Sequence, residues 1–401
     1  MSAVPLLVPV TPRPSTNEEP PVALVHVTVG SPRAVRDAAT AVYRQTRQGR
    51  RVIAVSAGPV DPLVSVLHRI GVSAVAAKAH APELVSAPVV VVEGVPSEPN
   101  EVEAVARPVR VALAGCGVVG GGLYIRLWDD PRFEIASVLV RDPRRRRKPQ
   151  PDPTKLVTNI DALLATSPDV IIDALSDAEA GRFLTRVALA RGISVVSANK
   201  QALGAELDQL QALADRTGAR LGVSACVGGG GPLIETLLRA RDHGPIVAIE
   251  GVLNGTVNFL LNRLATGAAL SDAVAEAQAA GFAEADPSSD LEGRDASAKL
   301  QILSHLAFVD RKTVPSVQKL CPETALPEGP VRQIARADAT TASVAFEAVA
   351  GDPLFADLPD EWNALRVTCA DGQTFTCRGR GAGRWPTTES VWSDLLDIAE
   401  A

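Results

Sequence analysis

Val109-Arg-Val-Ala-Leu-Ala-Gly-Cys-Gly-Val-Val-Gly-Gly121 is the stretch of the sequence that decides the fold. Its first six residues read as an apolar strand, and glycines at 115, 117 and 120 follow before a helix that we expect to begin near Gly121. These glycines allow a tight turn and let a pyrophosphate reach the N-terminus of the helix. The glycine pattern alone is weak, but its place between a strand and a helix predicts a dinucleotide-binding site.

Beyond this motif, strands alternate with helices. The expected elements, in chain order, are strand 136–140, strand 169–174, helix 178–191, strand 193–197, helix 204–217 and strand 220–224. This alternation predicts a doubly wound parallel α/β sheet, which binds its ligands at the carboxyl ends of the strands. Lys200 follows the strand 193–197 and would lie at that edge.

The end of the second strand bears on the choice of cofactor. In NAD-binding sheets an acidic residue about twenty residues after the glycines holds the ribose hydroxyls, but Arg141 stands at this point. An arginine there would pair with the 2′-phosphate of NADP, and the basic run from Arg144 to Lys148 would strengthen the positive field. The sequence therefore favours NADP, while the adjacent Asp142 keeps NAD as the alternative.

Acidic residues crowd the stretch Gly-Phe-Ala-Glu-Ala-Asp-Pro-Ser-Ser-Asp-Leu-Glu-Gly-Arg-Asp-Ala-Ser-Ala-Lys-Leu-Gln-Ile-Leu at 281–303. Pro287 and Gly293 mark irregular backbone, and a helix is expected to follow. Asp295 and Lys299 lie four residues apart and so share one face of that helix. A lysine beside carboxylates can transfer a proton, or it can form an ordinary surface ion pair.

Composition excludes several classes of function. The net charge of −6 argues against nonspecific nucleic-acid binding, and no apolar run approaches the roughly twenty residues of a membrane helix. The five cysteines have no metal-ligand spacing, which favours a reduced, cytoplasmic setting over a disulfide framework. Only seven of the forty basic residues are lysines, so Lys200 and Lys299 stand out as groups that can release a proton.

Five motifs stand out along the chain: Gly-Cys-Gly-Val-Val-Gly at 115–120, Ser-Ala-Asn-Lys at 197–200, Asn-Gly-Thr-Val-Asn at 254–258, the acidic stretch at 281–303 and Gly-Arg-Gly-Ala-Gly at 379–383. They occur in the order found in homoserine dehydrogenases, and the chain resembles that family over about 106–401. The resemblance implies an NAD(P)-dependent interconversion of L-aspartate 4-semialdehyde and L-homoserine in threonine, methionine and isoleucine biosynthesis. It also implies a homodimer.

The same resemblance implies roles for individual residues. Lys299 would be the catalytic acid/base and Lys200 its electrostatic partner, with each ammonium lowering the pKa of the other. The substrate would be bound by Lys200 and by the carboxylates Glu284, Asp290 and Asp295, because an amino acid's amino group needs a carboxylate. The cofactor would be bound by Gly115, Gly117, Val118, Val119, Gly120, Arg141, Ser176, Ser197, Ala198, Asn199, Lys200, Gly281 and Gly381.

Three departures from the family's pattern keep alternatives open. The family places a monovalent cation, sodium or potassium, on positions that match Ser224, Val227, Gly229 and Gly231, but Ser224 stands where the pattern has glutamate. Phe282 replaces a common tyrosine, and the interval between Lys299 and Gly379 is short, which suggests a reduced substrate-domain sheet. A paralogue acting on another amino-acid aldehyde in secondary metabolism is one alternative. A non-catalytic partner of aspartate kinase is another.

The expected domains follow from these segments. They are a disordered lead-in at 1–20, a small α/β block and linker at 21–105, a Rossmann-type nucleotide-binding domain at 106–250, an α+β substrate and dimerisation domain at 251–375, and a return to the nucleotide-binding domain at 376–401. The block at 21–105 faintly resembles the start of an aspartate kinase, the enzyme fused ahead of some homoserine dehydrogenases. It lacks that family's lysine and Phe-Gly-Gly, so it is either a degenerate remnant or an unrelated module.

Overall fold

The computed structural model divides the chain into two compact units. Residues 1–108 with Asp129–Arg132 form the first unit, and Val109–Trp128 with Phe133–Ala401 form the second. The structure describes residues 7–9, 22–27, 31–56, 60–70, 72–77, 89–93, 107–204, 206–229, 231–308, 314–381 and 384–400.

The first unit contains a five-stranded sheet in the order β1-β2-β3-β5-β4, on which α1 and α2 pack side by side. Its elements are β1 (Leu7–Pro9), β2 (Val22–Val27), α1 (Pro32–Arg47), β3 (Arg51–Ser56), α2 (Asp61–Arg69), β4 (Ala74–Ala77) and β5 (Val89–Glu93). All strands but β1 run parallel. The sequence assigned no strand to 7–9, within its disordered lead-in, or to 74–77. Of the linker predicted at 94–107, only Arg107 belongs to the described residues.

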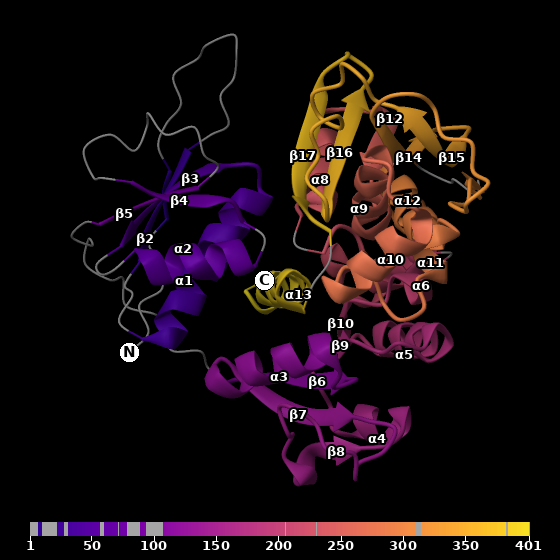
Figure 1. The fold of residues 1–401 in the computed structure, drawn as a ribbon. Coiled ribbons are helices and arrows are strands. Elements are labelled where there is room, and N and C mark those ends of the chain that lie inside the picture. The colour runs from indigo at the N-terminus through magenta and orange to yellow at the C-terminus, as the bar shows by residue number, and fades with distance from the viewer. Residues whose placement is uncertain are drawn as a thin grey trace. The chain divides into compact units, whose positions relative to one another are not determined.

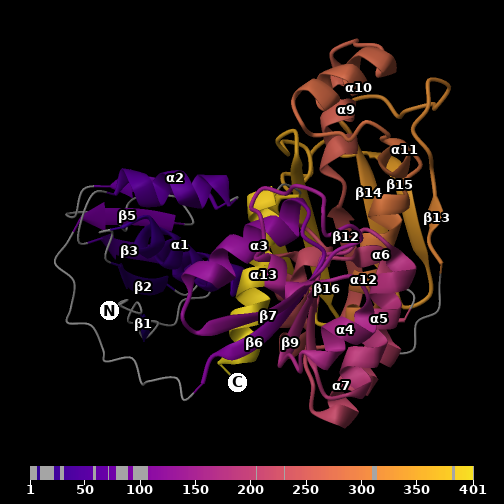
Figure 2. The same cartoon turned by 90° about the horizontal axis from the view of Figure 1, so that it is seen from below.

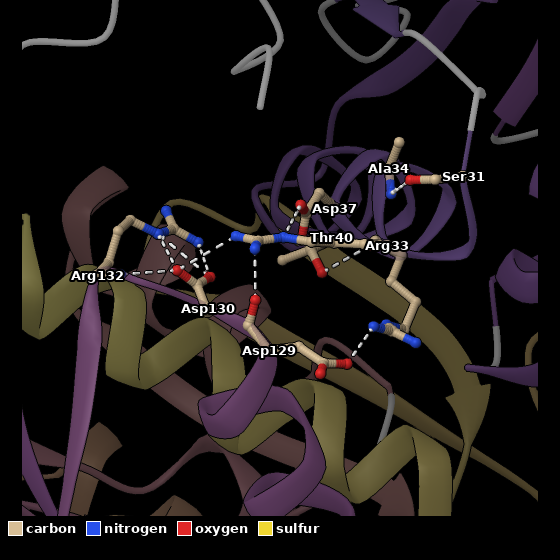
Figure 3. A network of polar contacts seen from close by, with 9 residues as sticks. Ser31, Arg33, Ala34, Asp37, Thr40, Asp129, Asp130 and Arg132 are labelled. Atoms are coloured by element: carbon tan, nitrogen blue, oxygen red, sulfur yellow. Dashed lines mark hydrogen bonds and ion pairs between the residues drawn. The ribbon is translucent and has the colours of Figure 1, made fainter. Parts of the chain in front are cut away.

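Arginines and aspartates form a polar network in the first unit (Figure 3). Arg36 Nη2 lies 2.8 Å from Asp129 Oδ2, and Arg33 Nη2 lies 3.6 Å from Asp130 Oδ1. Burial acts to raise the pKa of Asp130, but hydrogen bonds and the charge of Arg132 outweigh it and hold that pKa below its ordinary value. Most of these side chains are partly exposed, so each ion pair contributes little to stability.

The first sheet of the second unit is parallel, in the order β11-β10-β9-β6-β7-β8 (Figure 1). Its elements are β6 (Val109–Ala114), α3 (Val118–Asp129), β7 (Phe133–Leu139), η2 (Pro153–Lys155), β8 (Leu156–Val157), α4 (Ile160–Ala165), β9 (Val170–Asp173), α5 (Ala178–Ala190), β10 (Ser194–Ser197), α6 (Lys200–Leu203), α7 (Leu207–Thr217) and β11 (Leu221–Gly222). The strand order reverses between β6 and β9, as it does in dinucleotide-binding folds. The predicted doubly wound α/β fold is therefore confirmed.

Helices cover both faces of this parallel sheet. Alternate residues of β6 face opposite sides. Val111 and Leu113 join the core under α3, whereas Ala112 and Ala114 join the core under α4, α5 and α7. The helix α3 begins at Val118, three residues earlier than the sequence predicted. The third glycine, Gly120, therefore lies within the first turn of the helix.

The second sheet of this unit is mixed, in the order β13-β15-β14-β12-β16-β17, with α8 and α12 packed against it (Figure 1 and Figure 2). Its elements, with the segments around it, are η3 (Ser224–Cys226), α8 (Leu233–His243), β12 (Ile246–Val252), α9 (Gly255–Ala265), α10 (Leu270–Ala279), α11 (Ser288–Leu291), α12 (Arg294–Ala307), β13 (Ser316–Val317), β14 (Val331–Asp338), β15 (Ala342–Ala348), β16 (Trp362–Cys369) and β17 (Thr374–Arg380). The sequence alone indicates short β-like pieces near 342–349 and 364–378. The first corresponds to β15 and the second to the hairpin of β16 and β17, whereas β14 was not predicted.

The helix α13 (Arg384–Ala399) returns to the parallel sheet. Trp392 is buried, meets Phe133 edge-on and lies under the Arg126 guanidinium, which also pairs with Glu389. None of the described helices is long and apolar enough to cross a membrane. All five cysteines are free.

Gly122 brings α3 close to α13, and this contact is testable. A Cβ added at Gly122 would lie 2.7 Å from Thr388 Oγ1, so Gly122→Ala should lower the free energy of unfolding by about 1–3 kcal/mol. Thr388→Ala removes the clashing atom, and the double variant should recover part of the loss. Denaturant unfolding measures all three variants, with Gly244→Ala as the control, because a Cβ there meets no atom within 4 Å. Strictly additive losses at Gly122 and Thr388 would contradict this packing.

Candidate active site

The loop between β10 and α6 carries Lys200 to the carboxyl edge of the parallel sheet. Ser197 Oγ donates a hydrogen bond to Asp173 Oδ2 at 3.2 Å and accepts one from the Asn199 backbone N at 3.1 Å. The Asn199 side chain caps α6 by accepting from the Ala202 N–H, and it also donates to the Asp177 carbonyl. These bonds fix the backbone that enters α6, so Lys200 begins this helix in a defined position.

Asp173 anchors this loop, although no sequence pattern singled it out. Its carboxylate is fully buried at the end of β9, and burial raises its pKa to about 6. Gly181 makes room for the arrangement. A Cβ at Gly181 would lie 2.5 Å from Asn199 Nδ2 and 2.8 Å from Asp173 Oδ2.

The glycine loop after β6 has the close backbone contacts that a dinucleotide cradle requires. Gly115 has φ of 94°, and a Cβ on it would lie 2.6 Å from the Ala174 carbonyl oxygen. A Cβ on Gly120 would overlap the Gly115 carbonyl oxygen. A Cβ at Gly117, in contrast, would meet nothing within 4 Å, and Val118 at the N-terminus of α3 is exposed. An open face therefore remains at this helix terminus, where a pyrophosphate fits.

Arg141 and Ser176, both predicted cofactor residues, lie together at this edge. Arg141 Nη2 donates to Ser176 Oγ at 3.2 Å, and both side chains are at the surface. Asp142 is engaged by Arg144 at 3.3 Å. The acid adjacent to Arg141 is thus already paired with a neighbouring cation.

Asp295 lies between the two lysines. Its Oδ1 is 2.6 Å from Lys200 Nζ, and its Oδ2 is 2.8 Å from Lys299 Nζ. Asp295 and Lys299 are both 7% exposed, so the surface ion pair that the i,i+4 spacing alone would favour is excluded. Lys299 Nζ also donates to the Leu253 carbonyl at 2.7 Å.

Asn254 joins the same cluster, and the sequence assigned it no role beyond its place in the Asn-Gly-Thr motif. Its Nδ2 donates to Asp290 Oδ1 at 2.7 Å and to Asp295 Oδ2 at 2.9 Å. Asn363 is a second residue that sequence reasoning missed. It is fully buried on β16 and donates to the Leu253 carbonyl, the oxygen that Lys299 also contacts.

The charges of the cluster set its protonation. Burial alone would raise the pKa of Asp295, but Lys299 and Lys200 hold it well below its usual range. Burial would lower the pKa of Lys200, yet Asp295 and Asp290 outweigh burial and raise it. The expectation that the two lysines lower each other's pKa is therefore wrong for Lys200, because a carboxylate separates them. Burial raises the pKa of Asp290.

Two predicted residues lie apart from this cluster. The side chain of Glu284 is exposed and has no recorded hydrogen bond or ion pair with the described residues, although its carbonyl accepts from Gln278 Nε2 at 3.0 Å. Gly281, with φ of 78°, is also exposed. Both belong to the connection between α10 and α11.

The glycine-rich turn after η3 lies against the end of β17. A Cβ on Gly379 would overlap the Cα of Gly231, and a Cβ on Gly381 would overlap Asn363 Oδ1. Two of the backbone carbonyls predicted to bind a cation already accept a hydrogen bond within the protein. The Ser224 carbonyl accepts one from the Val227 N–H at 3.3 Å, and the Gly231 carbonyl accepts one from the Leu233 N–H at 2.9 Å. Among the described residues, no cluster of His, Cys, Asp or Glu could hold a metal ion.

Two family models match the chain. "Homoserine dehydrogenase, NAD binding domain" matches residues 115–224, and "Homoserine dehydrogenase" matches residues 232–396. The homoserine dehydrogenase of Synechocystis is 31% identical over 318 residues, which cover 72% of this chain and 73% of the relative. That of Neisseria gonorrhoeae is 31% identical over 328 residues, with 73% of each chain covered.

Solved structures agree with the sequence relatives. A homoserine dehydrogenase from Thiobacillus denitrificans matches with a TM-score of 0.66 and 28% identity, covering 73% of each chain. A hyperthermophilic archaeal homoserine dehydrogenase in complex with NADPH has the same fold, with a TM-score of 0.63 and 24% identity, over 73% of this chain and 97% of that one. The paralogue and the non-catalytic partner are not favoured by these comparisons.

Together, the buried lysine–carboxylate cluster beside a dinucleotide cradle and these matches show that the chain belongs to the homoserine dehydrogenase family of NAD(P)-dependent oxidoreductases, which interconvert L-aspartate 4-semialdehyde and L-homoserine.

Proposed function

We propose that Lys299 is the proton donor and acceptor of this homoserine dehydrogenase and that Lys200 stabilises charge on the reacting oxygen. The observation that carries the proposal is the pairing of both ammonium groups with the Asp295 carboxylate, at 2.6 and 2.8 Å. The two lysines come from different parts of the second unit. Lys200 follows β10 of the parallel sheet, and Lys299 belongs to α12, which packs against the mixed sheet. Two cations held at one point suit a substrate oxygen that gains negative charge.

The reaction needs one hydride and one proton for each aldehyde reduced. The nicotinamide supplies the hydride when bound. Lys299 gives its proton to the oxygen as the alcohol forms, and it takes the proton back in the reverse direction. Asp290, which lies beside Asp295 through their shared contact with Asn254, is proposed to receive the substrate's ammonium group, and Asp295 to hold the lysines in place. Glu284, on the exposed connection between α10 and α11, is proposed as a second carboxylate for that ammonium group. The fit of a dinucleotide rests on Gly115, Gly117 and Gly120.

A pair of lysine variants tests the assignment. Lys299→Ala should lower turnover by about two to four orders of magnitude, the usual worth of general acid–base catalysis, with little change in NADPH affinity. Lys299→Arg should not restore turnover, because guanidinium keeps its charge but does not release its proton near neutral pH. Steady-state kinetics, after circular dichroism has verified folding, measures both variants.

Lys200→Arg is the matched comparison, since it makes the same replacement on the other side of Asp295. We expect Lys200→Arg to retain more turnover than Lys299→Arg. If Lys299→Arg turns over at nearly the full rate while Lys200→Arg does not, the proton is transferred by Lys200.

We infer that NADP is the preferred cofactor. Arg141 stands where an acid would exclude a phosphate, and its contact with Ser176 places its guanidinium at the edge of the cradle. The NADPH complex of the archaeal neighbour is consistent with this choice. Ser197, Ala198 and Asn199 are proposed to line the nicotinamide side, with Gly281 and Gly381 opposite.

Arg141→Asp should weaken NADPH binding far more than NADH binding. The loss of a charge-assisted phosphate contact should lower NADPH affinity by about ten- to a hundredfold. Fluorescence titration of both cofactors measures the two dissociation constants. Arg146→Asp is the control, because it makes the same charge change at an exposed position of the basic run. Equal losses for NADPH and NADH in Arg141→Asp would rule out a phosphate contact.

The remaining proposals concern assembly and the first unit. We propose that the family's homodimer is kept, and that a sodium or potassium ion on the carbonyls of Ser224, Val227, Gly229 and Gly231 is an optional feature. We also propose that the α/β block at 21–105 is a remnant of a fused aspartate kinase without kinase activity, with docking on a separate aspartate kinase as its remaining role. The block lies outside both family matches, which begin at residue 115.

A chain beginning at residue 107 should therefore keep the turnover number of the full chain. The physical reason is that every proposed catalytic and cofactor residue lies in the second unit, whose core clusters contain no residue before 109. Aldehyde-dependent NADPH oxidation measures turnover, and a radiolabelled-ATP assay looks for aspartyl phosphate. Phosphorylation of aspartate by the full chain, or a folded truncation without turnover, would contradict the proposal.

A further inference from the structure

The amide group of Asn254 makes one hydrogen bond through its oxygen and two through its nitrogen. Its Oδ1 accepts from the Val257 N–H at 2.8 Å, which caps the N-terminus of α9. This bond fixes the orientation of the amide, so Nδ2 must face the other way. There its two N–H groups meet Asp290 at 2.7 Å and Asp295 at 2.9 Å.

We propose that Asn254 is a positioning residue of the dehydrogenase reaction, whose amide holds the Asp290 and Asp295 carboxylates side by side in their ionised, substrate-binding arrangement. The inference rests on the functions proposed above for these two aspartates: Asp290 binds the substrate's ammonium group, and Asp295 holds the two lysines. Asn254 itself is 3% exposed, so water does not substitute for its donors.

The neutrality of Asn254 suits this role. Lys200, Lys299, Asp290 and Asp295 sum to no net charge when all four are ionised. An arginine or lysine in place of Asn254 would make the cluster positive and repel the ammonium group of the substrate. An amide donates two hydrogen bonds and leaves the charge unchanged, so the cluster can accept an ammonium at one end and a developing oxyanion at the other.

The helix cap and the positioning role can be separated by one substitution. Serine is as good an N-cap as asparagine, so Asn254→Ser should keep α9 capped. Its short hydroxyl cannot reach both carboxylates. Asn159→Ser is the matched control, because Asn159 caps α4 in the same way, by accepting from the Ala162 N–H at 2.8 Å, and is exposed.

Asn254→Ser should raise the Michaelis constant for homoserine by about ten- to a hundredfold, the factor that corresponds to losing one hydrogen bond to a charged group. The change in turnover should be smaller, and the NADP dissociation constant and unfolding midpoint should stay near those of Asn159→Ser. The acid limb of kcat/KM should also move to higher pH. Loss of the amide donor disfavours the ionised form of Asp290, whose other charged neighbours are Asp295, Lys299 and Lys200.

Asp290→Asn completes the test by probing the proposed substrate role directly. If Asp290→Asn raises the Michaelis constant while Asn254→Ser changes neither that constant nor the acid limb, the positioning role is overturned and the proposed site stands. If Asp290→Asn itself leaves the Michaelis constant unchanged, the substrate role of the aspartate is wrong. Should Asn254→Ser fail to fold, Asn254→Asp serves instead. It keeps the cap, replaces both donors by a third carboxylate, and should raise the Michaelis constant at least as much.

Discussion

A single buried carboxylate holds the two lysines of the site together. Two ammonium groups brought this close would repel each other, and Lys299 has almost no contact with water that could screen the repulsion. Asp295 removes the difficulty by giving one oxygen to each lysine. Breaking a buried ion pair of this kind from one side leaves an uncompensated charge, which typically costs about 3–5 kcal/mol. The geometry of the site is thus enforced by electrostatics as well as by packing.

This constraint reaches into both sheets of the second unit. The backbone around Ser197 is tied to Asp173, so the loop that carries Lys200 is attached to the parallel sheet. On the other side, Lys299 and Asn363 share the Leu253 carbonyl at the end of β12, which attaches α12 to the mixed sheet. Asp173, Asn363 and the Leu253 carbonyl have no proposed part in the reaction itself. Their hydrogen bonds hold the reacting groups at fixed distances.

The sequence predicted the parts of this arrangement that depend on local pattern. The glycines at 115, 117 and 120, the parallel strands and the shared face of Asp295 and Lys299 follow from short-range rules of turn geometry and periodicity. It could not predict that this face is buried, because an i,i+4 pair looks the same on a surface helix. The pKa of Lys200 was misjudged for the same reason. The spacing showed two lysines but not that a carboxylate would stand between them. Asn254 and Asp173 went unnoticed because their partners lie 41 and 24 residues away in the chain.

The packing of α13 bears on how the chain acquires its structure during synthesis. Trp392, Val391 and Leu395 complete the hydrophobic cluster beneath α3, β6 and β7, yet they are translated after the whole of the mixed sheet. A ribosome that has made residues 109–222 has therefore produced every strand of the parallel sheet but not the helix that seals one of its faces. Until α13 emerges, that face exposes apolar side chains, and exposed apolar surface of this kind makes partly folded chains prone to aggregation.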